Sequence, residues 1–163
     1  FLGIIFSIFL FYKNKKISFF KISDIISCAS PIGLFLGRIA NFINGELYGK
    51  ISTLPWSIIF PGAGNLSRHP SQIYEAILEG LFLFLIINFL ALKKGLILRP
   101  GITSSLFLIL YSFFRMIGEI FREPDQHLGY IFNNISMGFL LSLFMLFSGF
   151  VMLFYLYKNE KIK

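Results

Sequence analysis

Long apolar segments are the feature that most restricts how this chain can fold. Four of them are close to the length of about 20 residues that a membrane-spanning helix needs, and a shorter one opens the chain. The segments are Phe1–Tyr12, Ile22–Ile43, Ile73–Leu92, Gly101–Gly118 and Ile135–Tyr157. Only 14% of the residues are charged, whereas soluble domains carry about a quarter. The sequence therefore predicts an all-α fold, a polytopic transmembrane helical bundle of about five helices, in a single transmembrane domain over residues 1–163.

The chain begins inside an apolar run and without an initiating methionine. That run lacks the basic stretch and the small-residue cleavage site of a signal peptide. We therefore expect residues 1–12 to be the second half of a membrane helix, and the chain to be an N-terminally truncated fragment of a longer protein.

Histidine and cysteine are too scarce to indicate a metal centre. Cys28 is the single cysteine and lies in an apolar stretch, which favours a buried, inert thiol. The two histidines, His69 and His127, fall in different loops, so we expect no metal site. A glycine-rich phosphate loop ending in lysine is also missing, and we expect no cofactor.

Most of the basic residues follow the first, third and fifth apolar segments. These ten residues are Lys13, Lys15, Lys16, Lys21, Lys93, Lys94, Arg99, Lys158, Lys161 and Lys163. In an alternating chain they all fall on one side of the membrane, and the positive-inside rule makes that side cytoplasmic. The C-terminus is then cytoplasmic, and the long loops 44–72 and 122–134 lie on the opposite side. Topology therefore explains much of the net charge of +7, and no nucleic-acid partner is expected.

Topology does not explain Arg38, which lies inside the second segment. A charged side chain within a bilayer costs about 2.5 kcal/mol or more, so it normally pairs or faces a cavity. Helical periodicity places Arg38, Asn41 and Gly45 on one face. A neighbouring face carries a stripe of small residues, which predicts close packing against another helix. The stripe consists of Ala29, Gly33, Gly37, Ala40 and Asn44. The alternative interpretation is an arginine that extends from the helix end to the membrane interface.

The fourth segment carries a second polar face. Tyr111, Arg115 and Glu119 are spaced at i, i+4 and i+8, and Arg122 follows three residues later. On a continuous helix the four fall within a sector of about 80°. Arg115 and Glu119 alone could be a structural ion pair, but two arginines, a carboxylate and a phenol on one membrane face favour a functional site.

The start of the third segment, residues 68–76, has both a structural and a functional interpretation. Ser71 could cap the helix, and Gln72 and Glu75 would suit its N-terminal dipole. That explanation leaves His69 and the buried Glu79 unaccounted for. Several arginines near the outer half of the bilayer would bind phosphate, and we expect a phosphate at that depth to belong to a phospholipid head group.

Three stretches carry a family resemblance. GRIANFINGELYG at Gly37–Gly49 closely resembles the signature of the bacterial phosphatidylglycerol–prolipoprotein diacylglyceryl transferases. RHPSQIYEA at Arg68–Ala76 and YSFFRMIGEIFREPDQHLG at Tyr111–Gly129 resemble later motifs of that family, in the same order. The resemblance covers essentially the whole chain.

The resemblance implies a multi-pass enzyme of the bacterial plasma (inner) membrane, with seven helices of which this chain would hold five. Such enzymes transfer the diacylglyceryl group of phosphatidylglycerol to the lipobox cysteine thiol of a prolipoprotein, the first step of lipoprotein maturation. A thioether forms and glycerol phosphate leaves. The implied partners are phosphatidylglycerol, the prolipoprotein signal peptide with its lipobox cysteine, and membrane lipids.

The resemblance also assigns residues. Arg38 matches the signature arginine associated with the lipid head group, and the expected phosphatidylglycerol-binding set is Arg38, Asn41, Asn44, Glu46 and Arg122. The expected catalytic set is Tyr111, Arg115, Glu119 and His69.

The chain departs modestly from the family pattern. Ala40 replaces a usual glycine, Tyr48 a common tryptophan and Lys50 a usual arginine. A His-Gly-Gly motif of the family would precede Phe1, so we expect the chain to be inactive alone. The general base stays open among His69, Tyr111 and that upstream histidine.

Three other functions remain as alternatives. A transporter or flippase also holds charges within the membrane, near the midplane and often on repeated, broken helices. A structural membrane subunit would have polar residues that pair and tolerate joint replacement. Another phosphatidylglycerol-using transferase, such as a phosphoglycerol transferase, would give a product that carries glycerol phosphate.

Overall fold

The structure is a computed structural model that describes residues 2–15, 17–124, 129–132 and 135–160. Lys16, Lys161 and Lys163 of the basic set lie outside the described residues. So does the stretch 125–128 of the third motif, which includes His127.

The helices follow the apolar segments closely. They are α1 (Leu2–Lys15), α2 (Phe19–Asn44), α3 (Ser71–Glu75), η1 (Ala76–Phe82), α4 (Leu83–Asn88), η2 (Phe89–Lys93), η3 (Leu96–Leu98), α5 (Ile102–Phe121) and α6 (Met137–Glu160). Segments α3 to η2 form one continuous span over Ser71–Lys93, in which η1 and η2 are π-helical, and η3 is a short 3₁₀ helix. Within the described residues, four spans are long and apolar enough to cross a membrane: α2, Ser71–Lys93, α5 and Met137–Lys158. The predicted transmembrane helical bundle is confirmed.

A short hairpin precedes the last helix. Strands β1 (Tyr130–Phe132) and β2 (Ile135–Ser136) pair antiparallel, with Tyr130 opposite Ser136. The prediction that the helix begins at Ile135 is therefore wrong by two residues. The reason is that the Ser136 hydroxyl accepts a hydrogen bond from the Phe139 backbone N–H (3.1 Å), as an N-terminal cap does.

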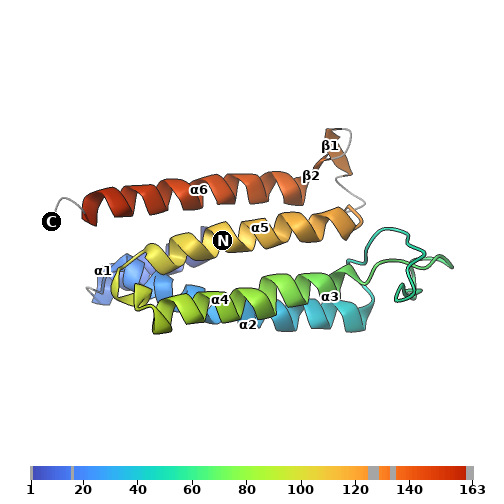
Figure 1. The fold of residues 1–163 in the computed structure, drawn as a ribbon, viewed down its shortest axis with the longest axis horizontal. Coiled ribbons are helices and arrows are strands. Elements are labelled where there is room, and N and C mark those ends of the chain that lie inside the picture. Colours follow the sequence, from blue (N-terminus) through green and yellow to red (C-terminus); the bar gives the residue numbers. More distant parts are fainter. Residues whose placement is uncertain (1, 16, 125–128, 133–134, 161–163) are drawn as a thin grey trace.

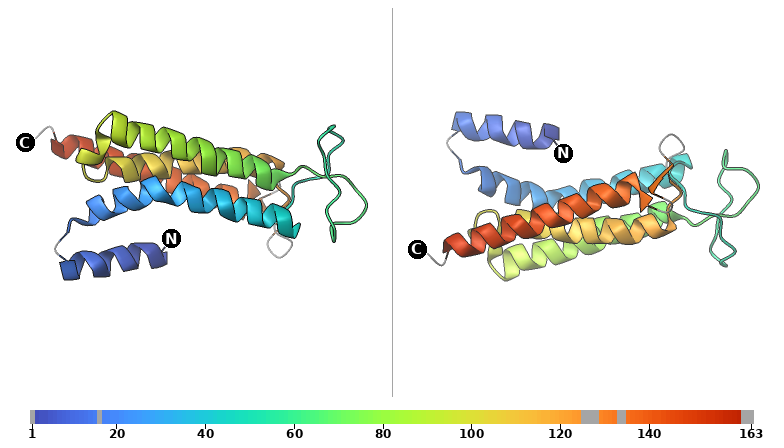
Figure 2. Two further views of the ribbon diagram at one scale, coloured as in Figure 1. Left: turned by 90° about the horizontal axis from the view of Figure 1, so that it is seen from below. Right: turned by 90° about the horizontal axis from the view of Figure 1, so that it is seen from above.

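The long helices lie side by side, and consecutive spans run in opposite directions (Figure 1). The basic connection between Ser71–Lys93 and α5 lies at the same end as the last residues of α6. The loop from Asn44 to Ser71 and the β hairpin lie at the opposite end, here called the loop end. Helix α1 lies beside α2 at the margin of the bundle (Figure 2). The predicted separation of the basic connections from the long loops is therefore present in the fold.

Close helix contact occurs at a different glycine from those that the sequence indicated. A Cβ atom on Gly80 of η1 would lie 2.6 Å from Cβ of Phe35 in α2, so only glycine fits there. In contrast, Gly33 and Gly37 have nothing within 4 Å of their would-be Cβ atoms in the described part of the chain. The prediction that the small-residue stripe of α2 packs closely is thus wrong for these residues. The small residue at this contact is on the neighbouring span instead.

At the end opposite the loops, Asp24 of α2 caps the start of α5. The fully buried Asp24 carboxylate accepts hydrogen bonds from the backbone N–H groups of Gly101 (2.7 Å) and Ser104 (2.8 Å), and from the Ser104 hydroxyl (2.5 Å). The first N–H groups of a helix lack intrahelical partners and carry partial positive charge, so a carboxylate is well suited to them. Asp24 therefore fixes the position of α5 along α2.

Candidate active site

Six ionisable side chains meet near the loop end of the bundle and form the Arg–Glu cluster. Its members are Arg38 of α2, Glu75 of α3, Glu79 of η1, Arg115 and Glu119 of α5, and Arg122 directly after α5. The side chains are at most 14% exposed. Three separate stretches of the sequence thus contribute charged groups to one buried site.

Two arginines hold the same two glutamates. Arg38 Nε lies 2.9 Å from Glu75 Oε2, and its Nη2 lies 3.1 Å from Glu79 Oε2. Arg115 Nη1 lies 3.1 Å from Glu75 Oε2 and 3.3 Å from Glu79 Oε1. The carboxylates of one span therefore join α2 to α5.

Glycine at position 118 makes this approach possible. A Cβ atom on Gly118 of α5 would lie 3.1 Å from Cγ of Glu75. Glu75 ends α3, and Glu79 lies within the π-helical η1. Local π-helical turns are frequent at functional sites, and here the π-helical segment begins directly after Glu75 and contains Glu79.

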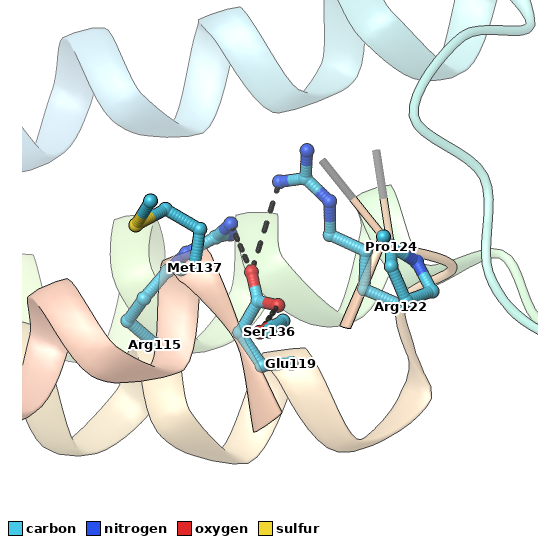
Figure 3. Close-up of a pocket in the computed structure, with 8 residues that line it drawn as sticks. Arg115, Glu119, Arg122, Pro124, Ser136 and Met137 are labelled. Atoms are coloured by element: carbon cyan, nitrogen blue, oxygen red, sulfur yellow. Dashed lines mark hydrogen bonds and ion pairs between the residues drawn. The ribbon is translucent and has the colours of Figure 1, made fainter. Parts of the chain in front are cut away.

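Glu119 joins the cluster to the start of α6 (Figure 3). One of its oxygens pairs with Arg115 Nη2, and the other accepts a hydrogen bond from the Ser136 hydroxyl at 2.6 Å. Arg122 Nη1 lies 4.0 Å from both Glu75 and Glu119. A Cβ atom on Gly138 would lie 2.5 Å from Glu119 Oε1, so glycine at this position leaves room for the carboxylate.

The cluster contains three cations and three anions, so its formal charges balance. Burying an isolated charge is costly, and removing one member of a buried pair leaves the other uncompensated. The ion pair of Arg115 and Glu119 that was one interpretation of the sequence is present. It belongs, however, to a network that also contains Arg38, Glu75 and Glu79 and that borders a cavity.

Two cavities flank Glu119 and Ser136. The inner cavity, of about 40 Å³, is lined by Arg115, Glu119, Arg122, Pro124, Gly129, Ser136, Met137 and Gly138. The outer cavity, of about 380 Å³, is lined by Lys50, Glu119, Ile120, Pro124, Ile135, Ser136 and Phe139. Figure 3 shows the side chains of Arg115 and Arg122 directed to the same region beside Glu119. Three charged groups of the cluster, Arg115, Glu119 and Arg122, thus border space that a ligand can occupy.

Tyr111 lies one turn before Arg115 and packs into the apolar core. Its ring stacks on Phe107 with centroids 5.8 Å apart, beside the buried Leu83 and Ile87. Its predicted catalytic role stays a prediction.

His69 lies in an aromatic group rather than in the Arg–Glu cluster. Its Nδ1 is 3.3 Å from the Tyr74 hydroxyl, which also accepts a hydrogen bond from Trp56 Nε1 at 2.7 Å. The His69 ring also contacts Phe121 edge-on, with centroids 5.3 Å apart. Since Tyr74 is adjacent to Glu75 in α3, this group borders the cluster along the chain, and the role of His69 stays a prediction.

Three residues predicted to bind the lipid lie at the end of α2. Asn44 and Glu46 are exposed and pair with each other, with Asn44 Nδ2 2.8 Å from Glu46 Oε1. The backbone carbonyl of the partly buried Asn41 accepts a hydrogen bond from the Glu46 backbone N–H at 3.0 Å. Within the described residues, no ion pair joins these three to the Arg–Glu cluster, and their role in binding stays a prediction.

The start of the third span differs in detail from its sequence interpretation. Ser71 is the first helical residue rather than the cap, and its hydroxyl donates to the Leu47 carbonyl at 3.2 Å. Gln72 Nε2 donates to the Glu46 carbonyl at 2.7 Å. Both side chains therefore hold the end of the first motif against the start of the second.

Sequence reasoning missed Glu75, Glu79 and Ser136 as site residues. Glu75 was interpreted as a favourable charge near a helix start, and Glu79 was noted as buried without a partner. The available signal was their i, i+4 spacing at the beginning of an apolar segment, since buried carboxylates in a membrane need cations. In the described ranges, no group of three or more His, Cys, Asp or Glu could hold a metal ion.

Comparison with known proteins gives the family. The family model described as prolipoprotein diacylglyceryl transferase matches residues 1–155. The chain belongs to the prolipoprotein diacylglyceryl transferase family. The three stretches that converge on the Arg–Glu cluster, around Arg38, Glu75 and Arg115, are the three motifs that resemble this family. With four long apolar spans, the chain is a multi-pass membrane protein.

Curated relatives agree with this assignment. The chain is 49% identical over 148 residues to the phosphatidylglycerol–prolipoprotein diacylglyceryl transferase of Rickettsia bellii (strain OSU 85-389), a match that covers 91% of the chain and 56% of the relative. It is 44% identical over 155 residues to the same-named protein of Methylocella silvestris, covering 95% of the chain and 57% of the relative. It is 47% identical over 151 residues to the same-named protein of Rhodopseudomonas palustris, a match that covers 91% of the chain and 52% of the relative. The chain spans about half the length of the relatives that it matches.

Proposed function

We propose that the protein transfers the diacylglyceryl group of phosphatidylglycerol to the lipobox cysteine of a prolipoprotein, forming a thioether and releasing glycerol phosphate. The observation that carries this proposal is the convergence of the three family motifs on one buried Arg–Glu cluster beside a cavity. The relatives named for this reaction support it.

We infer that the protein lies in the bacterial plasma membrane with the loop end facing outward and the C-terminus in the cytoplasm. The basic connections at the end opposite the long loops support this orientation. The Arg–Glu cluster would then lie toward the outer leaflet.

In the proposed reaction the cysteine sulfur attacks the glyceryl carbon that carries the phosphate ester. The carbon–sulfur bond forms as the carbon–oxygen bond breaks, and glycerol phosphate leaves with the bonding electron pair. The thiol proton goes to a base, for which His69 and Tyr111 remain candidates within this chain. Negative charge develops on the departing phosphate oxygen, and a fixed guanidinium nearby stabilises it more in a low-dielectric site than in water.

Arg38 and Arg115 are proposed to supply that positive charge. A guanidinium has five N–H donors, and Arg38 contacts the two glutamates through Nε and Nη2. The carboxylates therefore hold the planar group in place while it can still donate to a phosphate. Glu119, paired with both Arg115 and Ser136, is proposed to orient Arg115.

The test uses the complete protein that includes these residues, purified and incubated with phosphatidylglycerol and a lipobox peptide. Mass spectrometry of the peptide should show addition of one diacylglyceryl group on the cysteine. A peptide that gains glycerol phosphate instead would indicate a phosphoglycerol transferase. Movement of lipid between leaflets without any peptide product would indicate a flippase, and either result would reject the proposed reaction.

A further inference from the structure

Lys50 differs from the arginines of the cluster in having no carboxylate partner in the part of the chain that the structure describes. Arg38, Arg115 and Arg122 are balanced by Glu75, Glu79 and Glu119. Among the described residues, no carboxylate forms an ion pair with Lys50. Its amine instead donates to the backbone carbonyl of Ile120, at 2.8 Å. An anion near Lys50 would therefore add a favourable charge pair without breaking another.

The backbone around Lys50 holds the residue beside the end of α5. Lys50 N–H donates to the Phe121 carbonyl at 2.9 Å, and the Lys50 carbonyl accepts from His69 N–H at 3.0 Å. A Cβ atom on the preceding Gly49 would lie 2.6 Å from the Phe121 carbonyl oxygen, so glycine is needed for this approach. The loop thus places Lys50 at a defined position.

Lys50 lines the outer cavity, which the inner cavity adjoins across Glu119 and Ser136. Glu119 is the acidic group of this wall and would repel an anion if it were unpaired. One of its oxygens, however, pairs with Arg115 and the other accepts from Ser136. The Ser136 hydroxyl has already donated its one hydrogen to Glu119, so Lys50 is the polar group of the outer cavity most suited to a phosphate.

The other walls of the outer cavity are apolar. Ile120 of α5 is 60% exposed and Ile135 of β2 is 39% exposed, and Phe139 of α6 completes this side. Exposed apolar residues beside a cavity in a membrane bundle contact lipid chains rather than water. The cavity thus combines a cation that has no carboxylate partner among the described residues with an apolar margin, which suits a phospholipid better than a soluble phosphate.

We propose that the outer cavity is a binding subsite for the phosphoglycerol head group of an anionic diacyl phospholipid, with Lys50 as its phosphate-binding cation. The proposal rests on the proposed function and deepens it, because it adds to the charge-balanced Arg–Glu cluster a cation that binds the lipid anion. The lipid phosphate binds at Lys50, on the side of Glu119 and Ser136 where the two cavities adjoin, and its ester oxygen faces Arg115.

The experiment compares three variants in the complete protein. Lys50→Gln removes the charge but keeps an amide donor for the Ile120 carbonyl. Lys50→Arg restores the charge. Lys94→Gln removes an exposed charge at the opposite end of the bundle and is the matched control. Retention of phosphatidylglycerol and of phosphatidylcholine is measured by native mass spectrometry in mixed micelles, and transfer kinetics are measured with phosphatidylglycerol and a lipobox peptide.

Lys50→Gln should raise KM for phosphatidylglycerol about tenfold and leave kcat little changed, since a lost charge-assisted contact weakens binding by about this factor. Preferential retention of phosphatidylglycerol over phosphatidylcholine should fall in the same variant. Lys50→Arg should restore both quantities, and Lys94→Gln should match the wild type. A purely structural role for Lys50 would lower kcat or thermal stability without this lipid selectivity.

Wild-type transfer with an unchanged KM in Lys50→Gln would overturn the subsite and leave the proposed function standing. If the wild type transfers nothing, the proposed function fails, and loss of phosphatidylglycerol selectivity in Lys50→Gln would still support the subsite. Glycerol phosphate is included as an inhibitor. If Lys50→Gln weakens only its inhibition and not lipid binding, the site belongs to the soluble product and the lipid assignment is wrong.

Discussion

Arg38 of α2 and Arg115 of α5 share one oxygen atom, Oε2 of Glu75, at 2.9 and 3.1 Å. The two arginines come from different motifs, and neither helix alone could hold its cation in a membrane at low cost. The shared carboxylate makes the position of each guanidinium depend on the other. Substitutions at this site should therefore have effects that are not independent.

Replacing either shared arginine should abolish transfer. Arg38→Ala or Arg115→Ala in the complete protein removes the proposed charge stabilisation and leaves Glu75 partly uncompensated, which costs about 3–5 kcal/mol for a buried pair. Thioether formation on a lipobox peptide measures activity, and recovery in the membrane fraction measures insertion. Replacing either arginine by lysine should also give low transfer activity, because an ammonium group lacks the planar fork of donors of a guanidinium. Normal lipidation by either alanine variant would contradict the assigned site.

The two glutamates of the third span should differ in importance. Glu75→Gln weakens contacts with Arg38, Arg115 and Arg122, whereas Glu79→Gln weakens contacts with only the first two. We expect the larger fall in Tm, measured in detergent micelles, for Glu75→Gln.

A double-mutant cycle provides a sharper measurement of the same network. Arg38→Gln and Glu75→Gln should show a coupling energy of about 0.5–3 kcal/mol in reversible unfolding. Additive effects of the two changes would mean that the contact contributes nothing to stability.

Gly138→Ala should disturb the site from the neighbouring helix. The new methyl group would lie 2.5 Å from Glu119 Oε1 and would push the carboxylate away from Arg115. We expect transfer to fall at least tenfold, which corresponds to about 1.4 kcal/mol. The matched control is Gly33→Ala in α2, where the methyl group meets nothing within 4 Å in the described chain. Equal activities for the two variants would show that the position of Glu119 is unimportant.

Asp24→Ala should lower stability without directly affecting chemistry. The change removes the acceptor for Gly101 N–H, Ser104 N–H and the Ser104 hydroxyl. Loss of a helix cap costs about 0.5–2 kcal/mol, so Tm in detergent should fall while KM for phosphatidylglycerol stays near the wild-type value. Ser23→Ala removes a second contact of the Ser104 hydroxyl, at 2.9 Å, and leaves Asp24 in place, so it is the milder control. A selective rise in KM would contradict a purely structural role for Asp24.

The sequence predicted the spans well because bilayer length and apolarity are local properties. The second segment, predicted as 22–43, is helical over Phe19–Asn44, and the fourth, predicted as 101–118, is helical over Ile102–Phe121. The positions of the spans also predicted that basic connections and long loops alternate along the chain. The two faces that carry Arg38 and Arg115 also emerged from periodicity alone.

What could not be predicted depends on which helices meet and at what rotation. Periodicity places Arg38 on a face of α2, but it does not reveal that Glu75 faces it. The same limitation explains the wrong packing prediction for Gly33 and Gly37, because the close contact involves Gly80 of another span. The sequence also does not reveal that Lys50, which lies in a loop, is beside Ile120 and the outer cavity. Asp24 escaped notice because its acceptor role depends on the distant Gly101.

The cap at Asp24 has a mechanical consequence. Helices α2 and α5 are joined near both ends. Hydrogen bonds to Asp24 join them at one end, and ion pairs with Glu75 and Glu79 join them at the other. Sliding of either helix along its axis would have to break the contacts at both ends at once. The two helices are therefore expected to move as one rigid unit. If the protein acts on a phospholipid as proposed, the movement that admits the lipid would come from parts of the protein outside this helix pair, and Arg38 and Arg115 would keep their positions as the lipid enters.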